Sequence, residues 1–264
     1  MNNTYQTITL DVSKEGIATV TMIRAELHNA FNAEMIQELT NCYRALSVDM
    51  RVKLIVLRAE GRSFSAGADI NWMKSMVNAT ERENRQDSER LAELLRAINF
   101  CKKPTLARVQ GLALGGGVGL LCCCDIVVAS DRAKFGLTET KLGLVPAVIS
   151  PYVVDAIGTR QARRYFLTAE VFGAERAEKL GLASIVCAED DLDTRLNEQI
   201  EMLLATGPNA KEICKKLVQS VVGRTEAHQK KLDEYTTQVI AAVRVSEEGQ
   251  NGLNAFLNKE TPKW

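Results

Sequence analysis

Histidine is nearly absent from this chain, because only His28 and His228 occur among its 264 residues. A serine or cysteine nucleophile normally depends on a neighbouring histidine as its base, so the sequence offers almost no material for such a couple. We expect His28 to have a loop or ligand-proximal backbone role and His228 to be exposed on a charged helix. Acid or base chemistry must therefore come from another residue type.

Paired cysteine motifs are also missing. The seven cysteines are odd in number and include no C-x-x-C pair, which argues against both a disulfide framework and a zinc site. Cys122, Cys123 and Cys124 lie in an apolar stretch, where cysteine usually behaves as a small buried hydrophobe. We expect reduced, mostly buried cysteines and no bound metal.

The chain has no net charge, since 33 basic residues balance 33 acidic ones. This balance excludes an overall electrostatic attraction to nucleic acid or to an anionic membrane, so an anionic ligand must be met locally. No uncharged run is as long as a membrane span, and residues 1–6 contain no basic segment leading into an apolar one. We expect a cytoplasmic protein that binds neither nucleic acid nor membrane.

Nucleotide-binding fingerprints are absent, although two glycine-rich turns are present at residues 64–70 and 114–120. The second turn lacks the G-x-G-x-x-G spacing and no Lys-Ser or Lys-Thr pair follows it, which argues against a phosphate loop. Each turn joins a strand-like run to a helix-like one and can leave backbone N–H groups pointing outward. Alone, either turn is most simply structural. Two donors aimed at one point would form an oxyanion hole.

Strand and helix patterns alternate along most of the chain. Residues 8–10 and 16–22 predict an antiparallel hairpin, and Asn32 is a plausible N-cap for a helix that leads to a buried strand at 52–57. Thr80 and Glu83 form a capping box, and strands are expected at 105–109 and 125–129, before a short helix within 135–143. This rhythm is typical of a parallel α/β sheet. The charged run 81–90 predicts a solvated helix start, with a mobile cover over the site as the alternative.

Long amphipathic helical patterns replace the strands from about residue 190 onward. We therefore expect residues 1–195 to form the core that carries the site and residues 196–264 to form a helical oligomerisation region. Apolar stripes on such a tail favour a homo-oligomer, although a tail folded wholly onto its own core fits the pattern too.

Four ordered segments, 64–70, 111–120, 135–143 and 255–259, resemble the enoyl-CoA hydratase/isomerase (crotonase) superfamily over essentially the whole chain. The resemblance implies an α/β spiral of repeated ββα units with a C-terminal helical region, assembled as a trimer or a dimer of trimers. It also implies an acyl-CoA substrate, with coenzyme A as part of the substrate and no separate cofactor.

The resemblance also implies roles for particular residues. The backbone N–H groups of Ala68 and Gly116 match the two oxyanion donors, which agrees with the turn chemistry. Glu139 matches a catalytic glutamate whose pKa burial would raise. The alternative is a purely structural glutamate, whose negative charge is favourable in the first turn of a short helix because of the helix dipole. The implied substrate and CoA contacts are Leu27, His28, Ala66, Ala68, Asp69, Ile70, Asn71, Gly116 and Lys259, with the Ala66 carbonyl reading the adenine and Lys259 meeting a CoA phosphate.

Gly119 departs from the family pattern, because hydratases with two catalytic glutamates carry one of them at this position. A single carboxylate can serve both proton transfers of hydration, or it can move a proton between two carbons as in an enoyl-CoA isomerase. Segments 71–73 and 144–152 are similar to the bacterial methylglutaconyl-CoA hydratase branch and its isoprenoid-degrading relatives.

We expect hydration of a branched glutaconyl-CoA such as 3-methylglutaconyl-CoA, in leucine or isoprenoid catabolism. The alternatives are an isomerase and a non-catalytic CoA-ester-binding protein. A substrate of this kind carries a distal carboxylate and implies a basic or polar group in the pocket. Arg82, Arg85 and Lys141 are all expected to be solvated instead.

Overall fold

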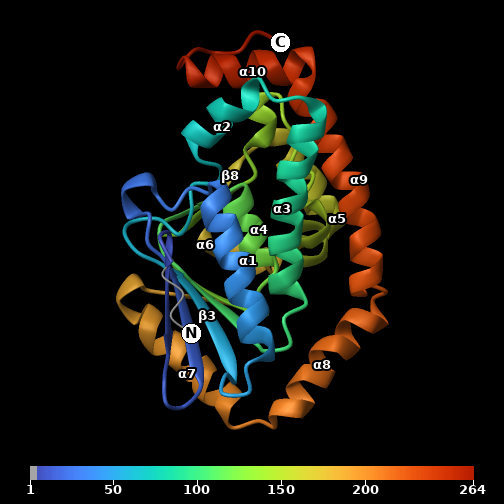
Figure 1. Ribbon diagram of the computed structural model, residues 1–264. Helices are drawn as coiled ribbons and strands as arrows, with labels where there is room; N and C mark the ends of the chain where they lie inside the picture. The colour runs from blue at the N-terminus through green and yellow to red at the C-terminus, as the bar shows by residue number, and fades with distance from the viewer. Residues whose placement is uncertain (1–4) are drawn as a thin grey trace.

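The computed structural model describes residues 5–264. The sequence analysis also made a prediction about residues 1–6, of which residues 1–4 lie outside the described range. A six-stranded sheet lies in the lower left of the view in Figure 1. Its strands, in spatial order, are β1 (Ile8–Val12), β2 (Ile17–Met22), β3 (Leu54–Ala59), β4 (Thr105–Val109), β6 (Ile126–Ser130) and β9 (Ile185–Cys187). The β1–β2 pair is antiparallel and all other pairs are parallel. The predicted hairpin and parallel sheet are confirmed.

A second, three-stranded sheet lies beside the first and has the order β5 (Leu112–Leu114), β7 (Lys134–Gly136) and β8 (Val171–Gly173). Consecutive strands divide between the sheets, since β4 and β6 join the large sheet while β5 and β7 join the small one. The short helix α4 (Gly116–Cys122) follows β5, and the 3-10 helix η2 (Glu139–Leu142) follows β7. The predicted ββα repetition is therefore confirmed.

Helix starts are placed by local capping interactions, as the sequence predicted. Asn32 begins α1 (Ala33–Val48), where its side-chain oxygen accepts a hydrogen bond from the Met35 amide at 2.9 Å. Thr80 and Glu83 form a reciprocal capping box at the start of α3 (Glu81–Asn99). Each cap satisfies backbone donors that the helix itself leaves unpaired. The beginning of α3 is solvated on one side only, because Asp87 and Ser88 are buried.

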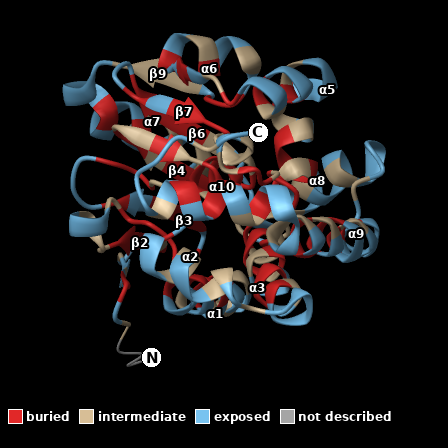
Figure 2. Cartoon of the chain, turned by 90° about the horizontal axis from the view of Figure 1, so that it is seen from above, coloured by how far each residue is buried: buried red, intermediate tan, exposed pale blue. Residues whose placement is uncertain are grey.

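The large sheet is covered on both faces. One face contributes to the main core, which also takes residues from α1, α3, α4 and α5 (Ser150–Thr168). The other face packs against α7 (Leu192–Leu204) through Leu192, Leu196 and Ile200. Figure 2 shows the buried strands between these helices. The domain boundary expected at 195/196 falls inside α7, and the division into two domains stays a prediction.

Buried free thiols account for part of the core. All seven cysteines are free; Cys42, Cys101 and Cys123 are buried, whereas Cys214 is exposed. Burial raises the pKa of Cys42 to about 11 and that of Cys124 to about 12. Thiols of this kind are inert packing groups.

The C-terminal part is helical as predicted and comprises α8 (Pro208–Val221), α9 (Glu226–Val245) and α10 (Glu247–Leu257). Helix α9 packs along α3, whereas α10 crosses the top of the molecule near α2 (Ile70–Val77) (Figure 1). Helix α8 has no buried residue. Helices α9 and α10 therefore bury side chains against the core of the same chain, whereas α8 contacts it through polar groups, with Lys215 paired to Asp125 at 2.8 Å and Gln219 donating to the Asn99 carbonyl at 2.9 Å. No helix within residues 5–264 is long and apolar enough to cross a membrane.

Close contact between α10 and η2 generates a stability prediction. A Cβ atom on Gly252 would lie 2.2 Å from the Leu142 carbonyl oxygen, so Gly252→Ala must separate α10 from η2. We expect a loss of about 2 kcal/mol in the free energy of unfolding, as for other overpacked sites, measured by urea titration. Gly207→Ala is the control, because the nearest atom to its Cβ would be 3.7 Å away. Equal unfolding free energies for the two variants would contradict this close contact.

Candidate active site

A cavity of about 780 Å³ opens between the two glycine turns, η2 and helices α2, α3, α9 and α10. Nine residues that the sequence singled out line it: Leu27, His28, Ala66, Ala68, Asp69, Ile70, Asn71, Gly116 and Glu139. Lys259 is exposed and is not among the described residues that line this cavity. Segments distant in the sequence thus come together at one place, except for the C-terminal lysine.

The two glycine turns lie side by side because their backbones pair. The Ser65 amide donates to the Leu112 carbonyl at 3.0 Å, and the Leu114 amide donates to the Ser65 carbonyl at 2.9 Å. Glycine is required for this approach, since a Cβ atom on Gly117 would lie 2.9 Å from the Ser65 carbonyl oxygen. The pairing holds the backbone after each turn at the same wall of the cavity.

Ala68 follows the first turn and keeps its amide free. Its neighbours are engaged with Phe31: the Gly67 carbonyl accepts from the Phe31 amide at 2.7 Å, and the Asp69 amide donates to the Phe31 carbonyl at 2.8 Å. Successive groups of an extended chain point to opposite sides, so the Ala68 N–H is directed away from Phe31. No acceptor for this N–H is present within residues 5–264.

Gly116 is the first residue of α4, where a backbone N–H has no partner inside the helix. The preceding Gly115 has φ 49° and ψ −117°, a conformation that only glycine adopts readily. A Cβ atom on Gly115 would also lie 3.0 Å from Glu139 Oε1. The second turn therefore places a free amide next to a carboxylate.

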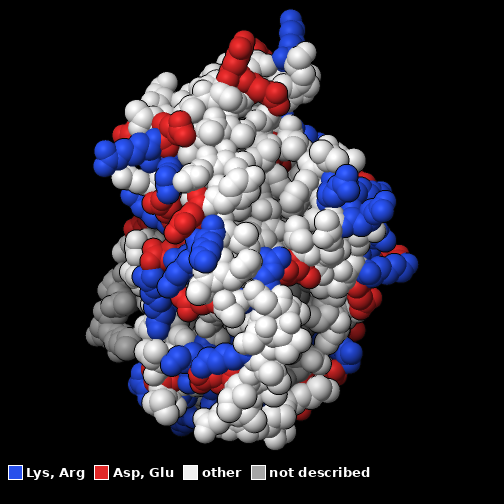
Figure 3. Space-filling view, turned by 90° about the vertical axis from the view of Figure 1, so that its right-hand side faces the viewer, with Lys and Arg blue, Asp and Glu red and all other residues white. Residues whose placement is uncertain are grey.

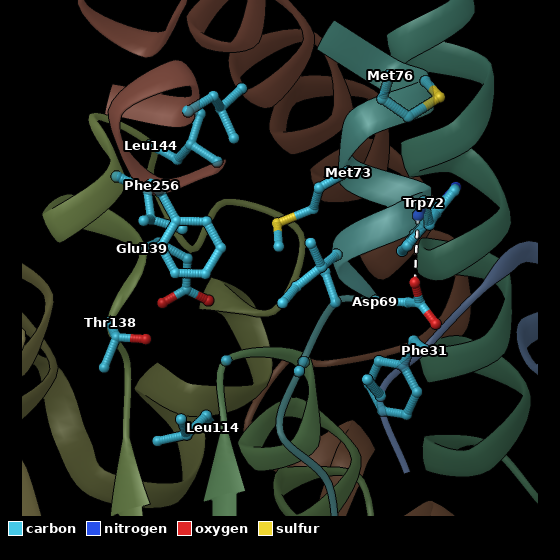
Figure 4. Close-up of a pocket in the computed structure, with 18 of the residues that line it drawn as sticks. Phe31, Asp69, Trp72, Met73, Met76, Leu114, Thr138, Glu139, Leu144 and Phe256 are labelled. Carbon is cyan, nitrogen blue, oxygen red and sulfur yellow. Dashed lines mark hydrogen bonds between the residues drawn. The ribbon is translucent and has the colours of Figure 1, made fainter. Parts of the chain in front are cut away.

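Glu139 begins η2, and its carboxylate points into the cavity between Thr138, Leu114 and Phe256 (Figure 4). Its Oε2 atom is fully shielded from solvent and has no hydrogen-bond partner in the described part of the chain. Burial raises the pKa of Glu139 to about 7. A carboxyl group that merely stabilised a helix start would face solvent, whereas this one is available for proton transfer near neutral pH.

Apolar side chains fill the space beside Gly119. A Cβ atom there would lie 2.4 Å from Ile149 Cγ2 and 3.6 Å from Leu95 Cδ2. Ile149 itself lines the cavity. A glutamate at residue 119 would collide with this side chain, so no second carboxylate reaches the cavity from this position.

Asp69 lines the cavity, and its carboxylate already accepts hydrogen bonds from other residues of the protein. It caps α2 by accepting from the amides of Asn71 at 2.7 Å and Trp72 at 3.3 Å, and it pairs with Arg24 Nη2 at 2.7 Å. Burial raises its pKa, but the hydrogen bond from Arg24 and those from the two amides outweigh burial and hold the pKa below its usual value. Asp69 therefore orients the first turn with its side chain.

Some of the residues expected to contact CoA are exposed at the cavity, and His28 forms hydrogen bonds within the protein. Leu27 and Ile70 are exposed at 40% and 51%, although both are large aliphatic side chains at the cavity. The His28 carbonyl accepts from the Ala66 amide at 2.9 Å, and its ring lies 3.0 Å from Ser63 Oγ. An apolar rim of this kind leaves surface for a ligand to cover.

Further residues line the cavity that the sequence analysis did not name individually as ligand contacts. Most are apolar: Phe31, Met73, Leu91, Ile149, Ile240, Leu253 and Phe256. Two cations, Lys141 and Arg244, also line the cavity, and Lys141 is exposed as predicted. The helical periodicity predicted an apolar stripe through Tyr235 and Val239 on α9, but Tyr235 is 65% exposed and it is Ile240 that lines the cavity.

Comparisons with known proteins agree with this site and fold. The sequence profile of the enoyl-CoA hydratase/isomerase family matches residues 12–264. An enoyl-CoA hydratase of Alternaria alternata is 31% identical, over 93% of this chain and 80% of that protein. A crotonyl-CoA hydratase of Syntrophomonas wolfei is 28% identical, over 97% of this chain and 96% of that protein.

Solved structures give the same result. The crystal structure of an enoyl-CoA hydratase from Shewanella pealeana has a TM-score of 0.80 and 40% identity, covering 99% of this chain and 97% of that one. The crystal structure of an enoyl-CoA hydratase from Mycobacterium avium subsp. paratuberculosis has a TM-score of 0.86 and 26% identity, covering 98% of this chain and 99% of that one. With the family profile covering nearly the whole chain, and with the crotonase-type fold and the paired glycine turns in place, the chain belongs to the enoyl-CoA hydratase/isomerase family.

Proposed function

We propose that this enzyme adds water to the 2,3-double bond of an enoyl-CoA thioester. The observation that carries the proposal is one buried, unpaired carboxylate, Glu139, in the same cavity as the free amides of Ala68 and Gly116. Hydration of a conjugated thioester places negative charge on the thioester oxygen. Two backbone donors aimed at that oxygen stabilise the charge, and losing one such donor typically costs roughly 100- to 1000-fold in rate.

Glu139 acts first as base and then as acid. Its carboxylate takes a proton from water while the water oxygen forms a bond to the β-carbon. The electrons of the double bond move toward the thioester oxygen, which Ala68 and Gly116 hold as an enolate. Glu139 then returns the proton to the α-carbon and is a carboxylate again. This sequence adds one water molecule and requires no group beyond the substrate's own coenzyme A.

The lack of a glutamate at residue 119 favours one further candidate reaction, isomerisation of the double bond. Since Ile149 fills the space beside Gly119, the same carboxylate could instead carry a proton between two carbons of a 3-enoyl-CoA, as an isomerase does. Oxygen-labelled water separates the two reactions, because hydration incorporates the label and isomerisation does not. A non-catalytic ester-binding role would leave the buried, free carboxylate of Glu139 without a use.

We further propose a branched glutaconyl-CoA, such as 3-methylglutaconyl-CoA, as the substrate. The segment 144–152 supports this choice by its resemblance to the methylglutaconyl-CoA hydratase branch, and residues 144–149 all line the cavity. Loss of the absorbance of the conjugated thioester measures the reaction. Faster hydration of crotonyl-CoA than of 3-methylglutaconyl-CoA would contradict this choice of acyl group while leaving the hydratase intact.

Removing the Glu139 charge tests the mechanism. Glu139→Gln keeps the shape of the side chain but cannot shuttle the proton, so we expect kcat to fall roughly 100- to 10,000-fold. Glu175→Gln is the control, because Glu175 is an exposed partner of Lys179 on a remote helix. A normal hydration rate in Glu139→Gln would refute the assignment.

The raised pKa of Glu139 predicts a pH profile. Because the reaction begins with the carboxylate, kcat/KM should increase about tenfold per pH unit below the pKa and level off above about pH 8. The midpoint should lie near the pKa of about 7. A profile already flat from pH 5 upward would show that another group controls the rate.

The same group links stability to pH. The folded-state pKa of about 7 lies above the usual value of 4.5, so the folded state binds the proton more tightly than the unfolded state does. The contribution of Glu139 to stability is fully present below pH 4.5 and is lost as the pH rises through 7, by about 3 kcal/mol in all. Unfolding titrations should show that Glu139→Gln removes this pH dependence.

We also propose that the chain assembles with copies of itself, as a trimer or a dimer of trimers, through helix α8. Five aliphatic side chains on and just after this helix are exposed by 58% or more: Ile213, Leu217, Val218, Val221 and Val222. Figure 3, which faces the side carrying α8 and α9, shows a largely uncharged band running down the molecule. Exposed apolar stripes of this kind are typical of interfaces.

Charged substitutions test the interface. Leu217→Lys with Val221→Lys should reduce the assembly to smaller species, because two ammonium groups would have to be buried at the interface. Light scattering measures the mass, and Lys216→Gln on the same helix is the control. A monomeric wild-type protein would refute self-association.

A further inference from the structure

A charged pair interrupts the apolar wall of the cavity. Asp87 on α3 and Arg244 on α9 both line the cavity, and Arg244 Nη1 donates to Asp87 Oδ2 at 3.1 Å and to Asn84 Oδ1 at 3.4 Å. The side chains are exposed by only 5% and 19%. An ion pair kept inside an acyl-binding cavity needs an explanation, because hydrophobic side chains of similar volume often stabilise a protein as well or better.

Arg244 lies away from the segment expected to hold coenzyme A. Figure 1 places the blue segment around residues 24–30 on the left and the ends of α3 and α9 on the upper right. Gln250 joins α9 to α2 at this end, since its Nε2 donates to the carbonyls of Arg244 at 2.7 Å and Val77 at 3.1 Å. Ala68, Glu139 and Arg244 all line the same cavity, so the acyl chain of a thioester held at Ala68 has a continuous cavity in which to extend toward Arg244.

The guanidinium retains binding capacity. Arginine has five N–H donors in a fork, and within residues 5–264 only those of Nη1 have an acceptor. Nε and Nη2 are left for a ligand. A hydrocarbon chain would leave these donors unpaired at a cost, whereas a carboxylate matches the guanidinium fork with two hydrogen bonds.

Asp87 holds Arg244 from one side. Burial raises the pKa of Asp87, and Arg244 and Arg90 act in the opposite direction on it. Within the described residues only Arg244 forms an ion pair with Asp87, whereas Arg90 is exposed and does not line the cavity. Asp87 therefore fixes the Nη1 side of the guanidinium and leaves its other donors to a ligand.

We propose that Arg244 binds a carboxylate at the far end of the acyl chain, with Asp87 positioning the guanidinium. The substrates are then CoA monothioesters of dicarboxylic acids. This inference rests on the proposed acyl-CoA site and names the residue that selects the acyl group. An uncharged acyl chain of the same length would bind more weakly.

Saturated thioesters test the inference without turnover. Succinyl-CoA, glutaryl-CoA and adipyl-CoA would each be compared by titration calorimetry with the analogue whose terminal carboxylate is a carboxamide. We expect the wild-type protein to bind at least one acid roughly 10- to 100-fold more tightly than its amide, the usual range for a hydrogen-bonded charge. Asp87→Asn with Arg244→Gln should abolish that preference without leaving a buried charge unpaired.

A second ion pair between α3 and α9 serves as the control for loss of the contact between these two helices. Arg96 and Asp233 also join α3 to α9, with side chains exposed by 20% and 7%, but neither is among the described residues that line the cavity. Arg96→Gln with Asp233→Asn should keep the preference for the acid, with thermal melting used to confirm folding of both double variants.

Two outcomes would overturn the inference. One is a wild-type protein that binds none of the three acids more tightly than its amide, a result that needs no variant. The other is a folded Asp87→Asn, Arg244→Gln protein that keeps the preference. Failure of the hydratase itself is a separate result, seen as an absence of turnover with acid binding intact.

Discussion

The pairing of two glycine turns is the constraint on which the site depends. Backbone hydrogen bonds between Ser65 and residues 112 and 114 bring together segments that follow different strands. That approach is possible only because glycines stand where a Cβ atom would collide with backbone. The donors are therefore backbone groups held by the sheet itself. Electrostatic stabilisation of this kind needs no reorganisation during the reaction, and a scaffold of paired strands supplies that rigidity.

The acid and base role proposed for Glu139 depends on its burial. Glu139 adjoins the second turn, and its Oε2 atom has no partner among the described residues. Burial outweighs the hydrogen bond from its own backbone N–H and raises its pKa to about 7. A second carboxylate nearby would have split the two pKa values and divided the roles between two groups. Ile149 occupies the space beside Gly119 instead. In the proposed hydration, Glu139 both takes and returns the proton, so its shielding from bulk water is part of that proposed mechanism.

Local signals were readable from the sequence, and long-range ones were not. The caps at Asn32 and Thr80 and the two turns depend on residues a few positions apart, and the structure places them as expected. Family resemblance supplied Glu139, which spacing alone leaves as an ordinary helix-start residue. The pair of Asp87 and Arg244 joins residues 157 positions apart, and nothing in either segment indicates it. Lys259 was expected at the ligand but is exposed outside the cavity lining.

The C-terminal helices combine two roles that an amphipathic pattern cannot separate. Helices α9 and α10 complete the cavity, because Ile240, Leu253 and Phe256 close its inner wall and Gly252 rests against η2. Helix α8 connects α7 to α9 with its aliphatic face uncovered. The same apolar spacing thus serves the acyl pocket in one helix and the surface in another. Since α9 packs on α3 and carries Arg244, the docking of the tail also fixes the part of the cavity proposed to bind the end of the acyl chain.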